Sequence, residues 1–348
     1  MNATGTSNPE YVNARVRSRR AALFGEDEYR KLIRMGTGEI ARFMEENGYE
    51  TEINALAARH DGVDLIEYAL NHNMAANFED VLRWADGRVY EDVARYLRKF
   101  DAWNVKTVLR GIYADTDREV VEADLIRAGE FDEATLSALV DAGSIDAVVE
   151  TLDGTGFGAP LREAMGDYET TGALVPLENA VDRAFYERLI EDASARGEAG
   201  ETYVEFLQAE IDFRNLRNAL RIARSGADID PEDYFIVGGR EFDADELRRL
   251  TATREELVAR IRESEYGEEL DDALDEFETA DSLIGFERAL EGALLSYFDA
   301  MTKVYPMSIC PVLAYVLGKE REVDNVRAIA RGVEAGLSDD EIERELVL

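Results

Sequence analysis

The sequence contains little cysteine, proline or lysine, and it has no long apolar run. Its one cysteine, Cys310, excludes an intramolecular disulfide and fits a thiol-reducing compartment. Because Cys310 lies between Ile309 and Pro311, we expect its thiol to be buried. No stretch approaches the roughly 20 apolar residues of a membrane-spanning helix, and the most apolar window, residues 308–318, is too short. Residues 1–10 lack the basic and apolar regions of a signal peptide, so any work at a membrane is expected to depend on a partner.

Histidine is also scarce. His60 and His72 are the only two histidines, and neither has a cysteine or second histidine at the spacing of metal ligands. We therefore expect no zinc site and interpret both as ordinary helix residues.

Acidic residues far outnumber basic ones. The 75 acidic and 39 basic residues give a formal net charge of −36, which repels nucleic acid and anionic lipid headgroups. Arginine carries nearly all the positive charge, because lysine occurs only at positions 31, 99, 106, 303 and 319. Molar salt would screen this self-repulsion, since it shortens the Debye length to roughly 3 Å. The composition favours a salt-accumulating cytoplasm, as in halophilic archaea; the alternative is simply an acidic soluble protein.

The pattern of apolar residues predicts an all-α fold. With 46% apolar residues in 348, the chain can bury a core and form two or three globular units. Three-to-four-residue apolar spacing recurs in nearly every segment, and alternating strand patterns are close to absent. Breaks are expected at residues 36–38, 153–158 and 225–231. A capping box at Ser338 and Glu341 predicts a short last helix.

Three segments share one pattern, in which an acidic residue is followed by Asn at the third position and Arg at the ninth. The three sets are Asp101, Asn104 and Arg110; Asp212, Asn215 and Arg221; and Glu322, Asn325 and Arg331. The asparagines lie 111 and 110 residues apart. The segment 130–132 recurs 111 residues later as 241–243, and a weaker copy begins at Phe24, a few residues out of step. We therefore predict three homologous helical units, at 1–118, 119–230 and 231–348.

On a helix, the acidic residue of each motif falls within the apolar stripe, the Asn lies at its edge and the Arg points away. A buried carboxylate must be paired or hydrogen-bonded. One hypothesis makes Asp101, Asp212 and Glu322 equivalent sites for a cation or for a partner's basic residue. The favoured hypothesis is structural, with each carboxylate fixing its helix to a neighbour through Arg or backbone amides.

The same residues carry a family resemblance. Residues 310–329, Cys-Pro-Val-Leu-Ala-Tyr-Val-Leu-Gly-Lys-Glu-Arg-Glu-Val-Asp-Asn-Val-Arg-Ala-Ile, resemble the C-terminal signature of the C subunits of archaeal A-type ATP synthases. Residues 11–18, Tyr-Val-Asn-Ala-Arg-Val-Arg-Ser, resemble the opening of that family, and the segments around Asn104 and Asn215 match its earlier copies. The resemblance covers nearly the whole chain, and it extends to the homologous d subunits of V-type ATPases.

The resemblance implies an all-helical funnel of three pseudo-symmetric units. Its mouth would receive the D and F subunits of the central stalk, and its base would rest on the proteolipid rotor ring. It implies one copy per complex, at the cytoplasmic side of the cell membrane, with no catalytic residue, cofactor or metal of its own.

Other interpretations have less support. The glycine-rich residues 154–158 lack the Lys-Ser or Lys-Thr of a phosphate loop, so we interpret them as an interdomain turn, and Gly238-Gly239 as a turn before a helix. A peptide-binding α-helical repeat scaffold is the alternative function, but it predicts a period of about 30–50 residues. An enzyme would need a convergent set of titratable residues, and the sequence shows no such set.

Overall fold

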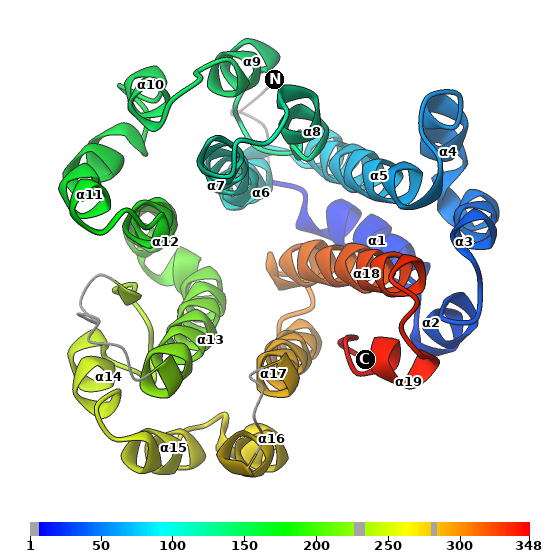
Figure 1. Cartoon of the computed structure of the whole chain (residues 1–348). Helices are drawn as coiled ribbons and strands as arrows, with labels where there is room; N and C mark the ends of the chain where they lie inside the picture. Colours follow the sequence, from blue (N-terminus) through cyan, green and yellow to red (C-terminus); the bar gives the residue numbers. More distant parts are fainter. Residues whose placement is uncertain (1–6, 226–233, 280–283) are drawn as a thin grey trace. The chain divides into compact units, whose positions relative to one another are not determined.

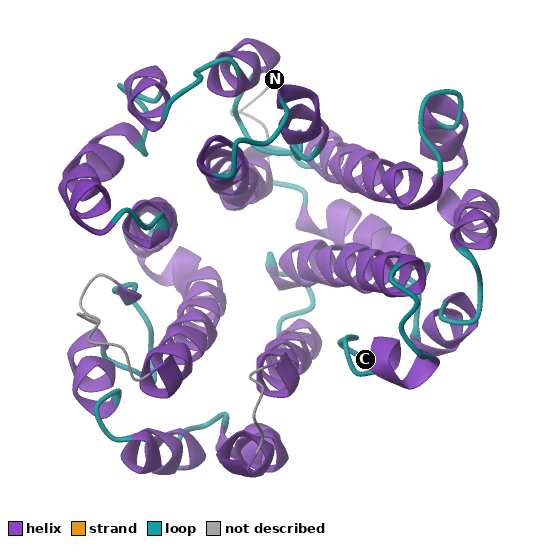
Figure 2. Ribbon diagram, viewed as in Figure 1, coloured by secondary structure: helices purple, strands orange, loops and turns teal. Residues whose placement is uncertain are grey.

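The computed structural model describes residues 7–225, 234–279 and 284–348. Within these ranges the chain forms helices joined by turns and contains no β-strand (Figure 2), which confirms the all-α prediction. Beyond Ser225, the break expected at residues 225–231 lies outside the described residues. None of the described helices has the length and apolar character needed to span a bilayer.

The chain divides into two compact units. Unit 1 consists of residues 1–93, 126–128 and 279–348, and unit 2 consists of residues 94–125 and 129–278. Unit 1 thus joins the two ends of the sequence, whereas unit 2 is built from its middle. These units are defined by contacts and the three predicted repeats by sequence pattern, so the threefold division stays a prediction.

Unit 1 is built around one long C-terminal helix (Figure 1). Its helices are α1 (Pro9–Arg20), α2 (Glu26–Leu32), α3 (Thr37–Met44), a π-helical turn (Glu45–Tyr49), α4 (Glu50–Leu56), α5 (Gly62–Trp84), α17 (Ile284–Val304), α18 (Cys310–Glu334) and α19 (Asp339–Glu343). Helix α18 packs against α1, α2, α3, α5, α17 and α19. The division between the units falls within α6 (Gly87–Leu97).

Unit 2 combines two helices of 20 and 25 residues with a series of shorter ones. They are α7 (Lys99–Tyr113), α8 (Arg118–Ala123), α9 (Glu133–Val140), α10 (Ile145–Thr151), α11 (Gly158–Thr171), α12 (Val175–Ser194), a 3₁₀ turn (Gly197–Gly200), α13 (Glu201–Ser225), α14 (Ala244–Leu250), α15 (Arg254–Arg262) and α16 (Gly267–Thr279). Helix α12 packs against α7, α11 and α13, and α13 also contacts α14 and α15.

Local sequence explains where several helices begin. Pro311 occupies the first turn of α18, where its fixed φ favours helix and its missing N–H has no intrahelical partner to lose. The Asp132 side chain caps α9 by accepting the Thr135 N–H at 2.9 Å. The capping box predicted at Ser338 and Glu341 is confirmed, because each side chain accepts the other residue's backbone N–H at the start of α19.

Several smaller predictions can also be compared with the structure. The Cys310 thiol is fully buried, as expected. Gly238 has φ +118°, which favours glycine, and lies in the expected turn before α14. His72 lies in α5, but the assignment of His60 to a helix is wrong. His60 lies in the turn before α5, where its ring packs edge-on against Tyr68 with centroids 4.7 Å apart.

Candidate functional site

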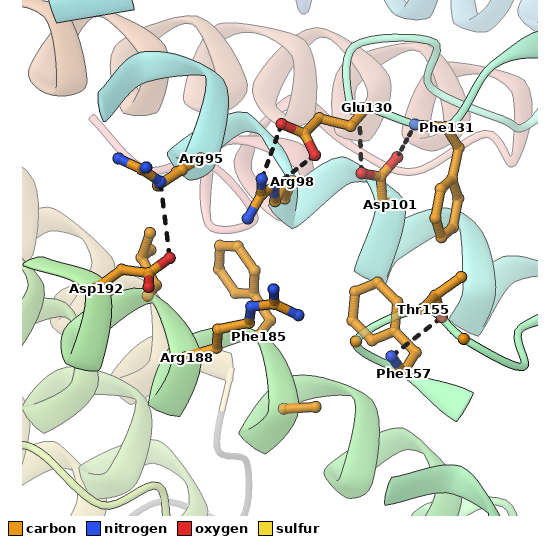
Figure 3. Close-up of a pocket in the computed structure, with 14 residues that line it drawn as sticks. Arg95, Arg98, Asp101, Glu130, Phe131, Thr155, Phe157, Phe185, Arg188 and Asp192 are labelled. Atoms are coloured by element: carbon orange, nitrogen blue, oxygen red, sulfur yellow. Dashed lines mark hydrogen bonds and ion pairs between the residues drawn. The ribbon is translucent and has the colours of Figure 1, made fainter. Parts of the chain in front are cut away.

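The first repeated carboxylate, Asp101 of α7, binds the backbone of the segment that precedes α9. Its Oδ2 accepts the Glu130 N–H at 2.8 Å and its Oδ1 accepts the Phe131 N–H at 3.0 Å (Figure 3). Asp101 is 3% exposed and the bonds span about thirty positions of sequence. Asp101 therefore fixes α7 to a distant turn of unit 2 through backbone amides.

The second repeated carboxylate, Asp212 of α13, makes the same kind of contact more fully. Its Oδ2 accepts the N–H groups of Arg240 and Glu241 at 3.1 and 2.9 Å, and its Oδ1 accepts that of Phe242 at 3.2 Å. The hydroxyl of Tyr266 also donates to Oδ2 at 3.0 Å. Asp212 is fully buried, and the segment it holds leads into α14.

The third repeated carboxylate, Glu322 of α18, holds a segment from the opposite end of the chain. Its Oε2 accepts the Phe24 N–H at 2.7 Å, 298 positions away in sequence. Its Oε1 accepts the Tyr49 hydroxyl at 2.5 Å and the Lys319 ammonium at 2.6 Å. Since Phe24 precedes α2 as Phe131 and Phe242 precede α9 and α14, the weak copy at Phe24 occupies the corresponding structural position.

We call Asp101, Asp212 and Glu322 the latch carboxylates, because each ties a helix to the turn before another helix. In two of the latches the turn approaches the carboxylate so closely that only glycine fits. A Cβ on Gly129 would lie 2.0 Å from Oδ1 of Asp101, and one on Gly239 would lie 2.3 Å from Oδ1 of Asp212. The third latch uses Glu, whose extra methylene lengthens its reach, and the two residues directly before Phe24, Ala22 and Leu23, are not glycine.

The repeated asparagines form a second kind of backbone clamp. The Asn215 carboxamide donates to the carbonyl of Ile236 at 2.8 Å and accepts the N–H of the same residue at 2.9 Å. Asn325 pairs in the same way with Val347, at 2.8 and 2.9 Å. Asn104 is 1% exposed. All three asparagines are therefore buried, at the position that the helical pattern places at the edge of the apolar stripe.

The repeated arginines lie toward the outside, as the helical pattern predicts. Arg331 pairs with the buried Glu67 of α5, and Arg110 pairs with Glu178 of α12. Their side chains are 61% and 51% exposed. Arg221 is also exposed. Screening by solvent makes such pairs modest contributors to stability, so the buried carboxylates and asparagines dominate each motif.

Burial changes the proton affinities of the site. Burial raises the pKa of Asp101 to about 6, although the backbone N–H groups of Glu130 and Phe131 oppose the shift. It also raises the pKa of Asp212 to about 6 against the opposing backbone and tyrosine hydrogen bonds. In the third latch, burial lowers the pKa of Lys319, and the adjacent Glu322 carboxylate opposes this change.

A pocket of about 330 Å³ lies beside the first latch, entirely within unit 2 (Figure 3). Its wall includes the turn at residues 154–157, so that turn lies inside unit 2, and its interpretation as an interdomain turn is wrong. Arg98 Nε lies 2.7 Å from Glu130, and Arg95 lies 3.6 Å from Asp192. Because these carboxylates and Asp101 are all engaged, the pocket presents no free acid–base pair.

The third latch lines a second cavity, of about 520 Å³, within unit 1. The positive φ of Gly48, +98°, forms the turn that brings Tyr49 to Glu322, and Asn73 holds that turn by donating to the Gly48 carbonyl at 3.1 Å. Sequence reasoning missed Tyr49 and Lys319 as latch partners. Lys319 could have been found, because it lies three positions before Glu322 on the same helix.

Within the described ranges, no group of three or more His, Cys, Asp or Glu side chains is arranged to hold a metal ion. The latch carboxylates instead meet N–H and O–H donors, which are the contacts that the structural hypothesis requires. A cation would have to displace those donors.

Known proteins resemble this chain over almost its full length, which includes the latch carboxylates. A family model described as ATP synthase (C/AC39) subunit matches residues 12–345. A protein of Haloferax volcanii, named as the C subunit of an A-type ATP synthase, is 64% identical over the full length of both chains. Its namesake in Halobacterium salinarum is 59% identical, again over both full lengths. A more distant namesake, from Methanosarcina mazei, is 31% identical over 99% of this chain and 94% of its own.

Proposed function

Because the chain belongs to the ATP synthase (C/AC39) subunit family, we propose that it is the non-catalytic adapter of an A-type ATP synthase. In this role it joins the D and F subunits of the central stalk to the proteolipid rotor ring. Ion flow turns the ring, the adapter turns with the ring, and the torque reaches catalytic subunits elsewhere in the complex. The adapter needs no cofactor for this role.

The observation that carries the proposal is the match along almost the entire chain. The family model spans residues 12–345, and the halophilic relatives align over their full lengths. The matched region includes all three latch carboxylates and their asparagines. The net charge of −36 agrees with the halophilic origin of the most similar of the relatives named above.

The hydrogen bonding within each unit supports a mechanical role. An adapter transmits torque only if its helices keep their positions under load. Each latch carboxylate and each clamping asparagine ties a helix to a distant segment, and Glu322 ties the C-terminal helix to the N-terminal part of unit 1. These ties bond backbone groups directly, so they resist relative sliding of the segments better than apolar contacts alone, which are non-directional.

Within this proposal the chain comprises three homologous units, at 1–118, 119–230 and 231–348, arranged as a funnel. The motif residues are structural in all three. One copy is held peripherally at the cytoplasmic side of the cell membrane by its partners. Contacts to the D and F subunits on one face and to the ring on another attach it there.

The experiment is affinity purification of the tagged, full-length chain from detergent-solubilised native membranes in molar KCl. Mass spectrometry then identifies the proteins that co-elute. We expect the D and F subunits together with the proteolipid. Recovery of the chain alone, as a free monomer, would contradict the adapter role and favour a helical scaffold that acts outside the complex.

A further inference from the structure

The turn between α17 and α18 exposes an apolar segment. Residues 303–307 are all exposed, and Val304, Tyr305 and Met307 are 67%, 38% and 48% accessible. We call this turn, together with the neighbouring Arg17 of α1, the turn patch. It consists of Lys303, Val304, Tyr305, Pro306, Met307 and Arg17.

Two side chains of α1 hold the backbone of the turn patch in place. Asn13, which is 1% exposed, donates to the carbonyls of Pro306 and Ser308 at 3.3 and 3.0 Å. Arg17 donates to the Pro306 carbonyl at 2.7 Å. A turn that is already ordered loses little conformational entropy when a partner binds, so its apolar side chains are well placed to contribute to affinity.

The charge of the turn patch is opposite to that of the chain as a whole. Neither Lys303 nor Arg17 has a carboxylate partner among the described residues, in a chain of net charge −36. Asp299 lies one turn before Lys303, but it pairs with Arg20 instead. Arg, Tyr and Met are enriched at the centres of protein interfaces. The turn patch combines these residue types with exposed apolar area and basic groups that have no described carboxylate partner.

We infer that the turn patch is the docking site for a segment of another subunit that presents carboxylates beside apolar side chains. The inference rests on the proposed function, which supplies such a subunit. Two other occupants fit the charges less well. An anionic bilayer is far wider than the patch, so it would also face other parts of a chain whose net charge is −36, whereas a short segment faces the basic patch alone. A second copy bound about a twofold axis would place the basic groups of both patches against each other.

A zero-length carbodiimide crosslink tests the contact directly. This reagent joins a lysine amine to a carboxylate that touches it, and the chain offers only five lysines as amine donors on side chains. Applied to the complex purified in molar KCl, it should join Lys303 to an Asp or Glu of another ATP synthase subunit. Lys31, which is exposed and pairs with Glu28 of its own helix, serves as the internal control. The absence of any Lys303 crosslink to another subunit would overturn the inference.

Substitutions provide the second measurement. We expect Val304→Ser with Met307→Ser to reduce the co-purified subunits about tenfold, as for a small interface hot spot. Val237→Ser, at a site that is 62% exposed in unit 2, is the matched control and should leave recovery unchanged. Because all three sites are exposed, both proteins should keep wild-type helicity and melting temperature, which circular dichroism checks.

The outcomes distinguish a failure of the proposed function from a failure of the turn-patch assignment. If the wild-type chain captures no ATP synthase subunit, the proposed function fails. If it captures them and the patch variant captures them equally well, the adapter role stands and the patch assignment fails. If the wild-type chain floats with anionic vesicles and the patch variant does not, the occupant is a bilayer. If the wild-type chain is a dimer in light scattering and the patch variant is not, the occupant is a second copy. Either result would overturn the inference.

Discussion

Removing the carboxylate of Asp212 should destabilise unit 2, because four buried or part-buried donors share that one carboxylate. The donors are the backbone N–H groups of Arg240, Glu241 and Phe242 and the hydroxyl of Tyr266. In Asp212→Ala each loses its partner, at about 1–3 kcal/mol apiece. Water entering the vacated space satisfies some of these donors, which keeps the summed loss in the lower half of its range, at about 4–8 kcal/mol.

One term opposes this loss. Burial raises the pKa of Asp212 from 3.8 to about 6, so the ionised carboxylate is disfavoured in the fold by roughly 3 kcal/mol at neutral pH. Removing it recovers that amount. The expected net loss in the free energy of unfolding is therefore about 1–5 kcal/mol. Asp212→Asn keeps one acceptor oxygen and should lose less than Asp212→Ala.

The assay is guanidinium chloride unfolding followed by far-ultraviolet circular dichroism, at pH 7.5 in molar KCl, with linear extrapolation. Asp245→Ala is the matched control, because Asp245 also lies in unit 2 but its side chain is 69% exposed. We expect the control to change stability by less than about 0.5 kcal/mol. Equal stabilities for Asp212→Ala and the control would refute the latch interpretation.

Four other perturbations have outcomes that the structure and the charge predict. The stability deficit of Asp101→Ala relative to the wild type should grow by about 1 kcal/mol between pH 7 and pH 5. The reason is that the pKa of Asp101 is raised to about 6 in the folded wild type, which therefore binds a proton in this range, whereas the unfolded chain stays ionised down to about pH 4. A deficit that does not change with pH in denaturant unfolding would be inconsistent with the raised pKa. Gly129→Ala should cost about 2–4 kcal/mol because its Cβ would overlap the Asp101 carboxylate, whereas Gly166→Ala, with open space around it in α11, should be neutral or stabilising in the same assay. Asn325→Ala should speed hydrogen exchange at Val347 and the rest of the C-terminal segment, because both backbone partners of the carboxamide are lost, and unchanged exchange would argue against the clamp. Dialysis from molar to millimolar salt should lower the melting temperature and helicity, because the net charge of −36 is then unscreened, and an unchanged melting curve would contradict this.

Periodicity and spacing predicted the helical class and the burial of the repeated carboxylates. Asp212 falls in the apolar stripe of its own helix, and a carboxylate there requires donors, which the structure supplies as backbone N–H groups. The capping box at Ser338 and the buried thiol of Cys310 follow from equally local rules. Local patterns work in these cases because burial and capping depend on residues of the same helix or turn, whereas the backbone donors that Asp212 binds lie 28 to 30 positions away.

Long-range partners could not be predicted in this way. Nothing in the spacing indicates that Glu322 binds Phe24, since the two are 298 positions apart and the first copy of the pattern is out of step. The clamp between Asn325 and Val347 was equally hidden, because a carboxamide that bonds one backbone residue leaves no repeating signature. Tyr49 reaches its site only through the turn at Gly48, whose conformation a sequence pattern does not specify.

The sequence resemblance and the geometry answer different questions. Residues 310–329 predicted the family, and the match over residues 12–345 confirms it. The acidic and Asn residues of the repeated motif, which help to carry the resemblance, are buried packing residues, so they say little about where partners bind. Residues 303–307 of the turn patch lie outside the motifs that carry the resemblance, whereas Arg17 belongs to the motif at residues 11–18, and the patch is distinguished by the exposure and charge of its side chains.

The central claim is that the chain transmits torque without performing chemistry. Its most direct test compares membrane vesicles from native cells with vesicles from cells that lack the chain, with ATP hydrolysis and gradient-driven ATP synthesis measured in both. The account predicts that loss of the chain abolishes gradient-driven synthesis, that hydrolysis by the catalytic subunits persists but no longer pumps ions, and that adding back the purified chain restores coupling. Synthesis that continues without the chain would contradict the adapter role, and purified chain that hydrolyses ATP by itself would contradict its lack of catalysis.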